Sequence, residues 1–97
     1  MNKLKLTISA RAVEDLSDIW GHIALDSVKA ADSFVEKLHR ECQRLAQTPE
    51  LGRPRDELIA GLRSLSHKGY VIFYTIGKKD LAIIRVLNGC MDIDSMF

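Results

Sequence analysis

Residues 61–87 read Gly-Leu-Arg-Ser-Leu-Ser-His-Lys-Gly-Tyr-Val-Ile-Phe-Tyr-Thr-Ile-Gly-Lys-Lys-Asp-Leu-Ala-Ile-Ile-Arg-Val-Leu, and this stretch decides the fold. Leucine, β-branched and aromatic residues form three runs in it, at 62–66, 70–76 and 81–87. Short segments that contain glycine and lysine separate the runs at the lengths that hairpin turns use. The stretch therefore predicts three consecutive strands that pair as an antiparallel meander.

The residues before this stretch carry the pattern of one strand followed by one helix. From residue 3 to residue 8, lysine or threonine alternates with leucine or isoleucine, which is typical of a strand with one buried face. Ser9 then offers its hydroxyl to the free amide groups of a helix that begins at Ala10. Apolar residues recur every three or four positions from Val13 to Ile23, so this helix has one apolar face.

A second helix follows after only two or three residues. Asp26 and Ser27 are its candidate caps, and the helical spacing of apolar residues continues for about six turns, until Pro49 forbids it. Because the link is so short, the two helices must fold back on each other as an antiparallel hairpin.

The order of elements is therefore β-α-α-β-β-β. This order predicts an α+β fold in which an antiparallel sheet carries the helical hairpin on one face. The 97 residues form a single domain, residues 1–97, because a core of this size leaves nothing for a second one. The hydrophobic content of 46% is enough to build that core without disulfides or metals.

Composition excludes several classes of protein. The 14 basic and 13 acidic residues give a net charge of +1, unlike a histone-like protein or an acidic tail. No apolar run reaches the length of a membrane span, and the alternating N-terminal segment does not read as a signal peptide. Cys42 and Cys90 lack the spacing of a metal motif, so we expect reduced thiols and a cytoplasmic protein.

We find no motif for a metal, a cofactor or nucleophilic catalysis. The histidines His22, His39 and His67 are too far apart in the sequence for a local metal motif. Asp18 and His22 share a helix face at the i, i+4 spacing of helical zinc sites, but such a site needs at least three ligands. We therefore read this pair as ordinary helix surface and assign no catalytic residue, metal or cofactor.

The last strand of the meander is apolar on both faces. Strict alternation places Ala82, Ile84 and Val86 on one face and Leu81, Ile83, Arg85 and Leu87 on the other. An antiparallel sheet covered on one side only normally has polar residues on its second side, so something covers this one. The chain's own tail is the first explanation, with Met91, Ile93, Met96 and Phe97. A partner protein is the second, and the two are compatible.

The basic residues gather in the sheet half of the chain. Residues 52–85 hold seven basic side chains against three acidic ones, a net charge of +4. Such a patch could bind a phosphate backbone or an acidic peptide, or it could serve only to keep the protein soluble. Arg85 stands out, because an arginine among aliphatic residues must reach solvent, pair with a carboxylate or serve a site.

Several local runs, in this order and spacing, resemble the ParE/RelE superfamily of bacterial toxins from type II toxin–antitoxin modules, and specifically its ParE-like branch. The resemblance spans nearly the whole chain. The matching runs are residues 6–12, 15–16, 19–20, 23–24, 30–34, 49–54, 61–63, 70–74 and 84–87.

The resemblance implies a small cytosolic toxin with the β-α-α-β-β-β fold. A ParD-like antitoxin would neutralise it by wrapping it with a flexible, usually acidic C-terminal segment. ParE toxins are associated with poisoning DNA gyrase by binding it, whereas RelE relatives are nucleases that cut messenger RNA on the ribosome. Antitoxins of this kind bind DNA through their own N-terminal dimer, so the resemblance implies no direct DNA binding by this chain and no membrane partner.

The chemistry of RNA cleavage separates these two activities. RelE-type nucleases use arginines, a lysine and a tyrosine near the C-terminus. Arg63 and Arg85 match the arginines. No Tyr, His, Lys or Arg follows Asn88, so an acid–base partner is missing there. We therefore favour gyrase inhibition. Asn88 and Met91 stand where the family commonly has His and Arg, which leaves open a degenerate toxin that retains only antitoxin binding.

Arg63 and Arg85 are expected to share the partner-facing side of the sheet. We expect the charge of Arg85 to pair with an antitoxin or target group and not within the fold. The full set of candidate target- or antitoxin-binding residues is Arg53, Arg63, Tyr74, Ile83, Arg85, Met96 and Phe97.

Overall fold

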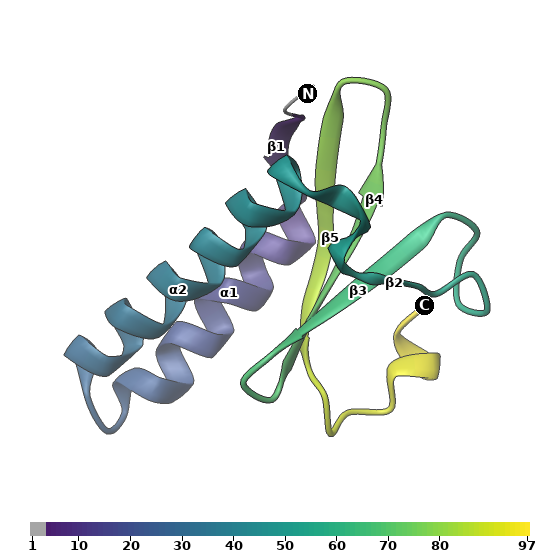
Figure 1. The fold of residues 1–97 in the computed structure, drawn as a ribbon. Helices are drawn as coiled ribbons and strands as arrows, with labels where there is room; N and C mark the ends of the chain where they lie inside the picture. The colour runs from purple at the N-terminus through teal and green to yellow at the C-terminus, as the bar shows by residue number, and fades with distance from the viewer. Residues whose placement is uncertain (1–3) are drawn as a thin grey trace.

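A computed structural model describes residues 4–97, and it contains the predicted elements in the predicted order (Figure 1). Lys3, which belongs to the predicted alternating segment, lies outside the described residues. Two short 3-10 helices, η1 and η2, and a two-residue strand, β2, are additional. The elements are β1 (Lys5–Ile8), α1 (Ala10–Ala24), α2 (Val28–Gln47), η1 (Pro49–Leu51), β2 (Arg53–Pro54), β3 (Leu62–His67), β4 (Tyr70–Ile76), β5 (Asp80–Asn88) and η2 (Ile93–Met96).

The sheet has five strands in the order β1-β5-β4-β3-β2. Strands β3, β4 and β5 form the predicted antiparallel meander, with Lys68 and Gly69 at φ 47° and 88° in the two-residue turn between β3 and β4. β2 pairs antiparallel with β3, whereas β1 pairs parallel with β5, so the sheet is mixed where we expected an antiparallel one. The sequence pattern identifies strands but carries no signal for which neighbour the first strand takes or in which direction it runs.

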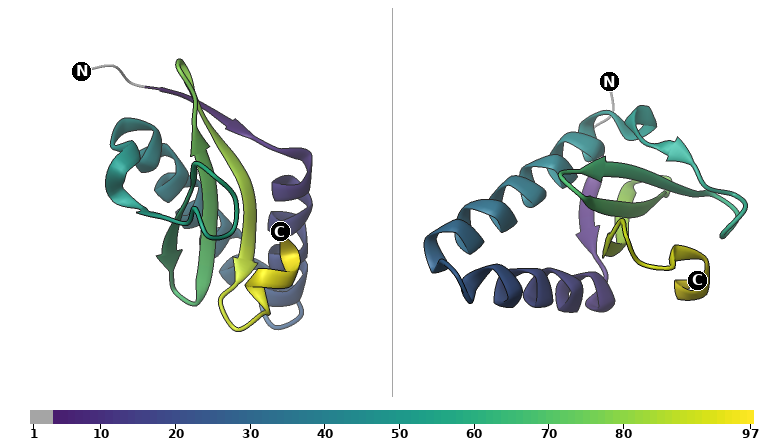
Figure 2. Two further views of the ribbon diagram at one scale, coloured as in Figure 1. Left: turned by 90° about the vertical axis from the view of Figure 1, so that its right-hand side faces the viewer. Right: turned by 90° about the horizontal axis from the view of Figure 1, so that it is seen from below.

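The helical hairpin lies on one side of the sheet and the C-terminal segment on the other (Figure 2). Both helices begin at predicted N-caps, because the Ser9 hydroxyl accepts from the Ala12 amide at 3.0 Å and the Ser27 hydroxyl from the Ala30 amide at 3.1 Å. Each helix buries one stripe of side chains against the sheet, as predicted. In α1 the stripe runs through Ala12, Asp15 and Ile19, so the predicted face is wrong at Val13, which is 53% exposed. In residues 4–97, no helix combines the length and apolar character needed to cross a membrane.

The chain's tail covers part of the second face of the sheet. Phe73 packs there, and its ring meets that of Phe97 edge-on at a centroid distance of 4.9 Å. Ile93 and Met96 pack against the same cluster, which confirms the tail as a cover for this face. Met91 is the exception, because 44% of it remains exposed.

A β-bulge in β5 changes the predicted faces of that strand. Tyr74 of β4 pairs with Ile83, whereas the preceding Phe73 pairs with Arg85, so Ile84 is one extra residue in β5. A bulge of this kind shifts the alternation of side chains by one position and bends the strand. The strict alternation predicted for residues 81–87 is therefore wrong beyond Ile83.

The two clusters of buried residues show the shifted alternation directly. Leu81, Ile83 and Val86 pack with the helices, while Ile84 and Leu87 pack with the tail. Strict alternation would instead place Ile83 with Leu87 and Ile84 with Val86. Both faces of β5 are still covered, as the apolar composition of the strand required.

Tyr74 joins the segment before β3 to the sheet by hydrogen bonds. Its side chain is fully buried, and its hydroxyl donates to the Pro49 carbonyl and accepts from the Gly52 amide at 2.9 Å. Gly52 packs so closely that a Cβ there would lie 2.5 Å from the tyrosine oxygen. Only glycine fits at this position.

Tyr74→Phe should lower the free energy of unfolding by about 1–3 kcal/mol, because the buried Gly52 amide would lose its acceptor. Urea denaturation measures this change. Tyr70→Phe is the matched control, since Tyr70 is only partly buried, and it should stay within about 0.5 kcal/mol. Equal stability of the two variants would refute the role given to the Tyr74 hydroxyl.

The two cysteines have free thiols and differ in solvent exposure. Cys42 is buried in the helix-side core, and this burial, with a smaller effect of Glu41, raises its pKa to about 11. Cys90 is exposed. Thiolates and not thiols are the nucleophiles, so the Cys42 thiol is inert at neutral pH.

We expect a thiol-specific reagent such as 5,5′-dithiobis(2-nitrobenzoate) to titrate one cysteine of the native protein at pH 8 and both in denaturant. Cys90→Ser should abolish the native reaction, and Cys42→Ser should leave it intact. Rapid labelling of Cys42 in the native protein would contradict its burial.

Candidate functional site

An ion pair joins α1 to β5. The carboxylate of Asp15 accepts two hydrogen bonds from Arg85, from Nε at 2.8 Å and from Nη2 at 2.9 Å. One of its oxygens also accepts from the Val86 backbone amide at 3.0 Å. The two side chains are only 10% and 11% exposed, and the hydrogen bonds to Asp15 raise the pKa of Arg85 above its ordinary value. This bidentate pair is the charge-assisted type that holds its geometry well.

This arrangement lies where β1 ends and β5 bulges. β1 covers the outer edge of β5 only as far as Ile83, where Ser9 ends the strand and begins α1. The Ser9 amide donates to the Ile83 carbonyl at 2.9 Å, and its hydroxyl donates to the Ile84 carbonyl at 2.8 Å. Together with Asp15, Ser9 thus satisfies backbone groups of β5 that lie beyond the end of β1.

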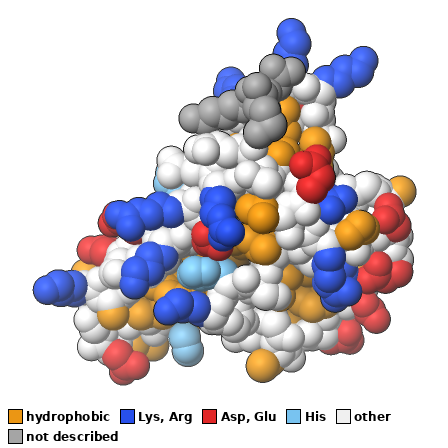
Figure 3. Space-filling model, viewed as in Figure 1, with side chains coloured by type: hydrophobic (Ala, Val, Ile, Leu, Met, Phe, Trp, Pro, Cys, Tyr) orange, Lys and Arg blue, Asp and Glu red, His pale blue; other side chains and the backbone are white. Residues whose placement is uncertain are grey.

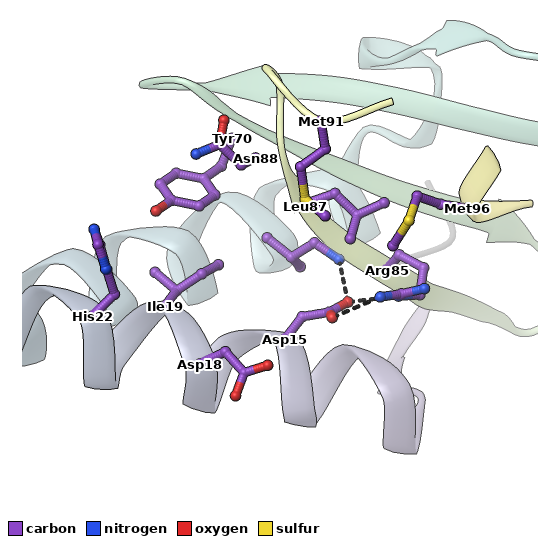
Figure 4. Close-up of a pocket in the computed structure, with 11 residues that line it drawn as sticks. Asp15, Asp18, Ile19, His22, Tyr70, Arg85, Leu87, Asn88, Met91 and Met96 are labelled. Atoms are coloured by element: carbon purple, nitrogen blue, oxygen red, sulfur yellow. Dashed lines mark hydrogen bonds and ion pairs between the residues drawn. The ribbon is translucent and has the colours of Figure 1, made fainter. Parts of the chain in front are cut away.

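A groove of about 460 Å³ opens beside this ion pair, between α1 and the end of β5 (Figure 4). In the figure, α1 forms one wall, and Met91, Leu87 and Met96 lie on the opposite side. Its size is that of an ordinary ligand site. The residues that line it are Asp15, Asp18, Ile19, His22, Tyr70, Arg85, Val86, Leu87, Asn88, Met91 and Met96.

The groove has the chemistry of a binding site more than of a metal centre. Asp18 and His22 share it, but within residues 4–97 no group of three or more His, Cys, Asp or Glu side chains is placed to hold a metal ion. Asn88 and Met91, the two positions that depart from the common family pattern, both line it.

Figure 3 shows that basic side chains also gather over α2, so positive charge is not confined to the sheet half.

The structure separates the two arginines that we expected to act together. Arg63 pairs across the strands with Tyr74 and Arg85 with Phe73, and these aromatic neighbours point to opposite faces. Arg63 donates to the Gly52 carbonyl through Nε at 3.0 Å and through Nη2. The expected shared side is therefore wrong, and so is the expectation that Arg85 lacks a partner within the fold.

The other candidate binding residues fall into two groups. Tyr74 and Ile83 are fully buried in the helix-side core, so their selection as contact residues is corrected: neither side chain is accessible to a partner in this conformation. The sequence pattern of β4 and β5 did not distinguish core positions from accessible ones. Arg53 is exposed on β2, and Met96 and Phe97 are partly buried in the tail.

Sequence reasoning missed Asp15 as a site residue. A signal was present, because Asp15 lies on the apolar stripe of α1 between Ala12 and Ile19, both buried. An acid on a buried stripe requires a partner, and Arg85 among aliphatic residues required one too. Pairing them across 70 positions needed the fold.

Comparison with known proteins agrees with this architecture. Residues 6–93 match the family model described as the ParE toxin of the type II toxin–antitoxin system parDE. Toxin ParE1 of Caulobacter vibrioides is 34% identical over 86 residues, which cover 88% of each chain. Toxin ParE1 of Mycobacterium tuberculosis is 33% identical over 78 residues, 79% of this chain and 74% of that one.

Solved structures share the fold. A chain of the chromosomal ParDE toxin–antitoxin system from P. aeruginosa superposes with a TM-score of 0.76 at 21% identity, over 89% of this chain and 96% of that one. The RelBE2 toxin–antitoxin complex of M. tuberculosis gives a TM-score of 0.63, also at 21% identity, over 91% and 93%. The fold is thus that of the ParE/RelE toxins. The chain belongs to the ParE toxin family and is a toxin of the type II toxin–antitoxin class.

Asp15→Ala should cost about 3–5 kcal/mol of stability, because it leaves the Arg85 charge unpaired in a nearly dry site and frees the Val86 amide. Urea denaturation gives the value, and Glu14→Ala on the exposed side of the same turn is the control. The double variant Asp15→Ala/Arg85→Ala should be more stable than the sum of the single effects by at least about 0.5 kcal/mol. Strict additivity would show that the pair is not coupled.

Proposed function

We propose that this chain is a cytoplasmic toxin that inhibits DNA gyrase by binding it and that a ParD-like antitoxin neutralises it. Membership of the ParE family carries this proposal. The curated relatives bear the name ParE, and the similar solved chains come from toxin–antitoxin systems. The activity consists of binding, so it uses no cofactor and no metal.

The groove favours inhibition by binding over RNA cleavage. A nuclease needs cations that are free to meet a phosphate. Here the charge of Arg85 is matched by Asp15, and Asp18 adds a second carboxylate to the same groove. Arg63 is held by backbone carbonyls of the segment before β3. These carboxylates oppose a phosphate backbone in the groove.

The alternative, a messenger RNA interferase, rests on His22 and Tyr70. Both line the same groove as Arg85, and imidazole and phenol are suitable proton carriers. Binding the scissile phosphate would fall to Arg85, whose charge Asp15 already matches. We therefore place this activity second.

Induced expression in a bacterium should arrest growth, and co-expression of the protein encoded by the neighbouring reading frame should relieve the arrest. Because a trapped gyrase breaks DNA, a DNA-damage reporter should rise while transcripts stay intact. Primer extension on abundant messages is the control. Codon-positioned cleavage on ribosomes would establish the interferase instead, and growth without arrest would indicate a degenerate toxin.

A further inference from the structure

We propose that the turn between β4 and β5 contacts DNA, and that Lys78, Lys79 and the neighbouring Lys5 bind the phosphate backbone of the duplex that gyrase holds. This inference rests on the proposed function, because gyrase brings the DNA to the toxin. It goes further by naming a second surface and the chemistry of its ligand. Three observations support it: the free charge of the turn, the side chains that it offers, and its place in the molecule.

The first observation is that the cations of this turn are free. Lys78 and Lys79 form the turn itself, which a hydrogen bond from the Gly77 amide to the Asp80 carbonyl closes at 2.8 Å. Lys5 begins the adjacent strand, and its amide donates to the Lys79 carbonyl at 2.9 Å. All three lysines are exposed, and none of them takes part in an ion pair among the described residues.

The turn stays positive when its own carboxylate is counted. Asp80, which is partly buried, is the acidic residue there, so three lysines and one aspartate give a net charge of +2. Basic side chains gather accordingly at the top of Figure 3, where Figure 1 places this turn. Two arginines of α2 differ, because Glu36 and Glu41 pair with them. The turn therefore holds charge that is available to a ligand.

The second observation is that the turn offers charge and few other contacts. Lysine ammonium groups bind phosphates as point charges and do not need to read base edges. Single-stranded RNA is usually held by aromatic side chains that stack on its bases, and residues 76–81 contain none. An acidic protein segment would need apolar anchors, and Ile76 is the exposed large apolar residue of this stretch. Duplex DNA, bound through its backbone without sequence preference, fits this chemistry best.

The third observation is the distance between the turn and the groove. In Figure 1 the turn lies at one end of β5, and the chain leaves for the tail at the other end. The strand Asp80–Asn88 separates them by about 25 Å at 3.2–3.4 Å per residue. Asp92 and Asp94 are exposed beyond the far end, so DNA would be attracted to the turn and repelled from the tail. A ligand in the groove and DNA at the turn would therefore not overlap.

Three cations are too few to hold the isolated chain on DNA at physiological salt. Each phosphate contact adds about 0.9 to the slope of log Kd against log salt concentration, so three contacts give about 2.7. A fourfold rise in salt then weakens binding about 40-fold. When gyrase holds both the toxin and the DNA, the contact becomes intramolecular, at an effective concentration on the order of millimolar. The turn thus strengthens the target complex without making the free chain a DNA-binding protein.

The first test measures binding of the isolated full chain to a short fluorescent duplex by anisotropy, at several low salt concentrations. Lys78→Glu/Lys79→Glu should lower the salt slope by about 1.8, because two contacts of about 0.9 each are lost. Lys78→Arg/Lys79→Arg keeps both charges and should keep the slope. Lys29→Glu/Lys37→Glu is the matched control, since it changes the net charge equally on exposed positions of α2, and it should leave the slope unchanged.

The second test measures the linear DNA that purified gyrase releases from a plasmid in the presence of each toxin variant. Lys78→Glu/Lys79→Glu should need at least about tenfold more toxin than the wild type for the same yield, because the intramolecular contact is lost. Lys29→Glu/Lys37→Glu should match the wild type within about twofold. The affinity of both double variants for the co-expressed product of the neighbouring reading frame should also stay within about twofold of the wild type.

Thermal unfolding of each variant verifies that it is folded. An unchanged salt slope in Lys78→Glu/Lys79→Glu would overturn the DNA contact, and so would an equal loss of slope in Lys29→Glu/Lys37→Glu. If the turn variant bound gyrase more weakly in the absence of DNA, an acidic protein surface would replace DNA as the ligand.

The two tests separate this inference from the proposed function. A lower slope with unchanged DNA trapping would overturn the role of the turn in the target complex and leave gyrase as the target. A wild-type toxin that traps no DNA with gyrase would overturn the proposed function, whereas the salt slope would still decide whether the turn contacts DNA.

Discussion

The structure depends on one buried carboxylate. Asp15 accepts hydrogen bonds from the Arg85 guanidinium and from the Val86 amide, and so it fixes α1 against the strand that lies between β1 and β4. A bulged strand whose outer edge has lost its neighbour would otherwise hold an unpaired amide and an unpaired charge in a nearly dry place. Asp15 accepts a hydrogen bond from the amide and neutralises the arginine, so it removes both free-energy costs. Ser9, the N-cap of α1, adds hydrogen bonds to the carbonyl groups of Ile83 and of the bulge residue Ile84.

The same interaction shapes the candidate groove. Because Arg85 is neutralised from within, the groove beside it presents apolar side chains and spare carboxylates, and its arginine is not free to meet a phosphate as a nuclease would require. Ser9 and Asp15 occupy the edge of β5, so extending the sheet there would require breaking their hydrogen bonds. The proposed inhibition by binding is consistent with a groove of this kind.

The candidate site was only partly predictable, for reasons that particular residues make clear. Arg85 was recognisable as needing a partner, since an arginine flanked by aliphatic residues is costly to bury. Its partner lay 70 positions away on α1, and nothing in the local pattern links the two positions. Tyr74 and Ile83 were among the candidate contact residues, yet both are fully buried. Met96 and Phe97 were sensible choices as the cover of the second face, which they are, and their contact with a target stays a prediction.

The sequence by itself determined the local structure: both N-caps, both helices, the three-strand meander and the need to cover the second face. These follow from short-range physics, in which spacing decides which face is apolar and a nearby hydroxyl decides where a helix begins. Only the tertiary structure decided the parallel pairing of β1 with β5, the bulge at Ile84 and the meeting of Asp15 with Arg85. Those depend on which distant groups come together, and a one-residue shift in a strand exchanges its faces without leaving a trace in the local pattern.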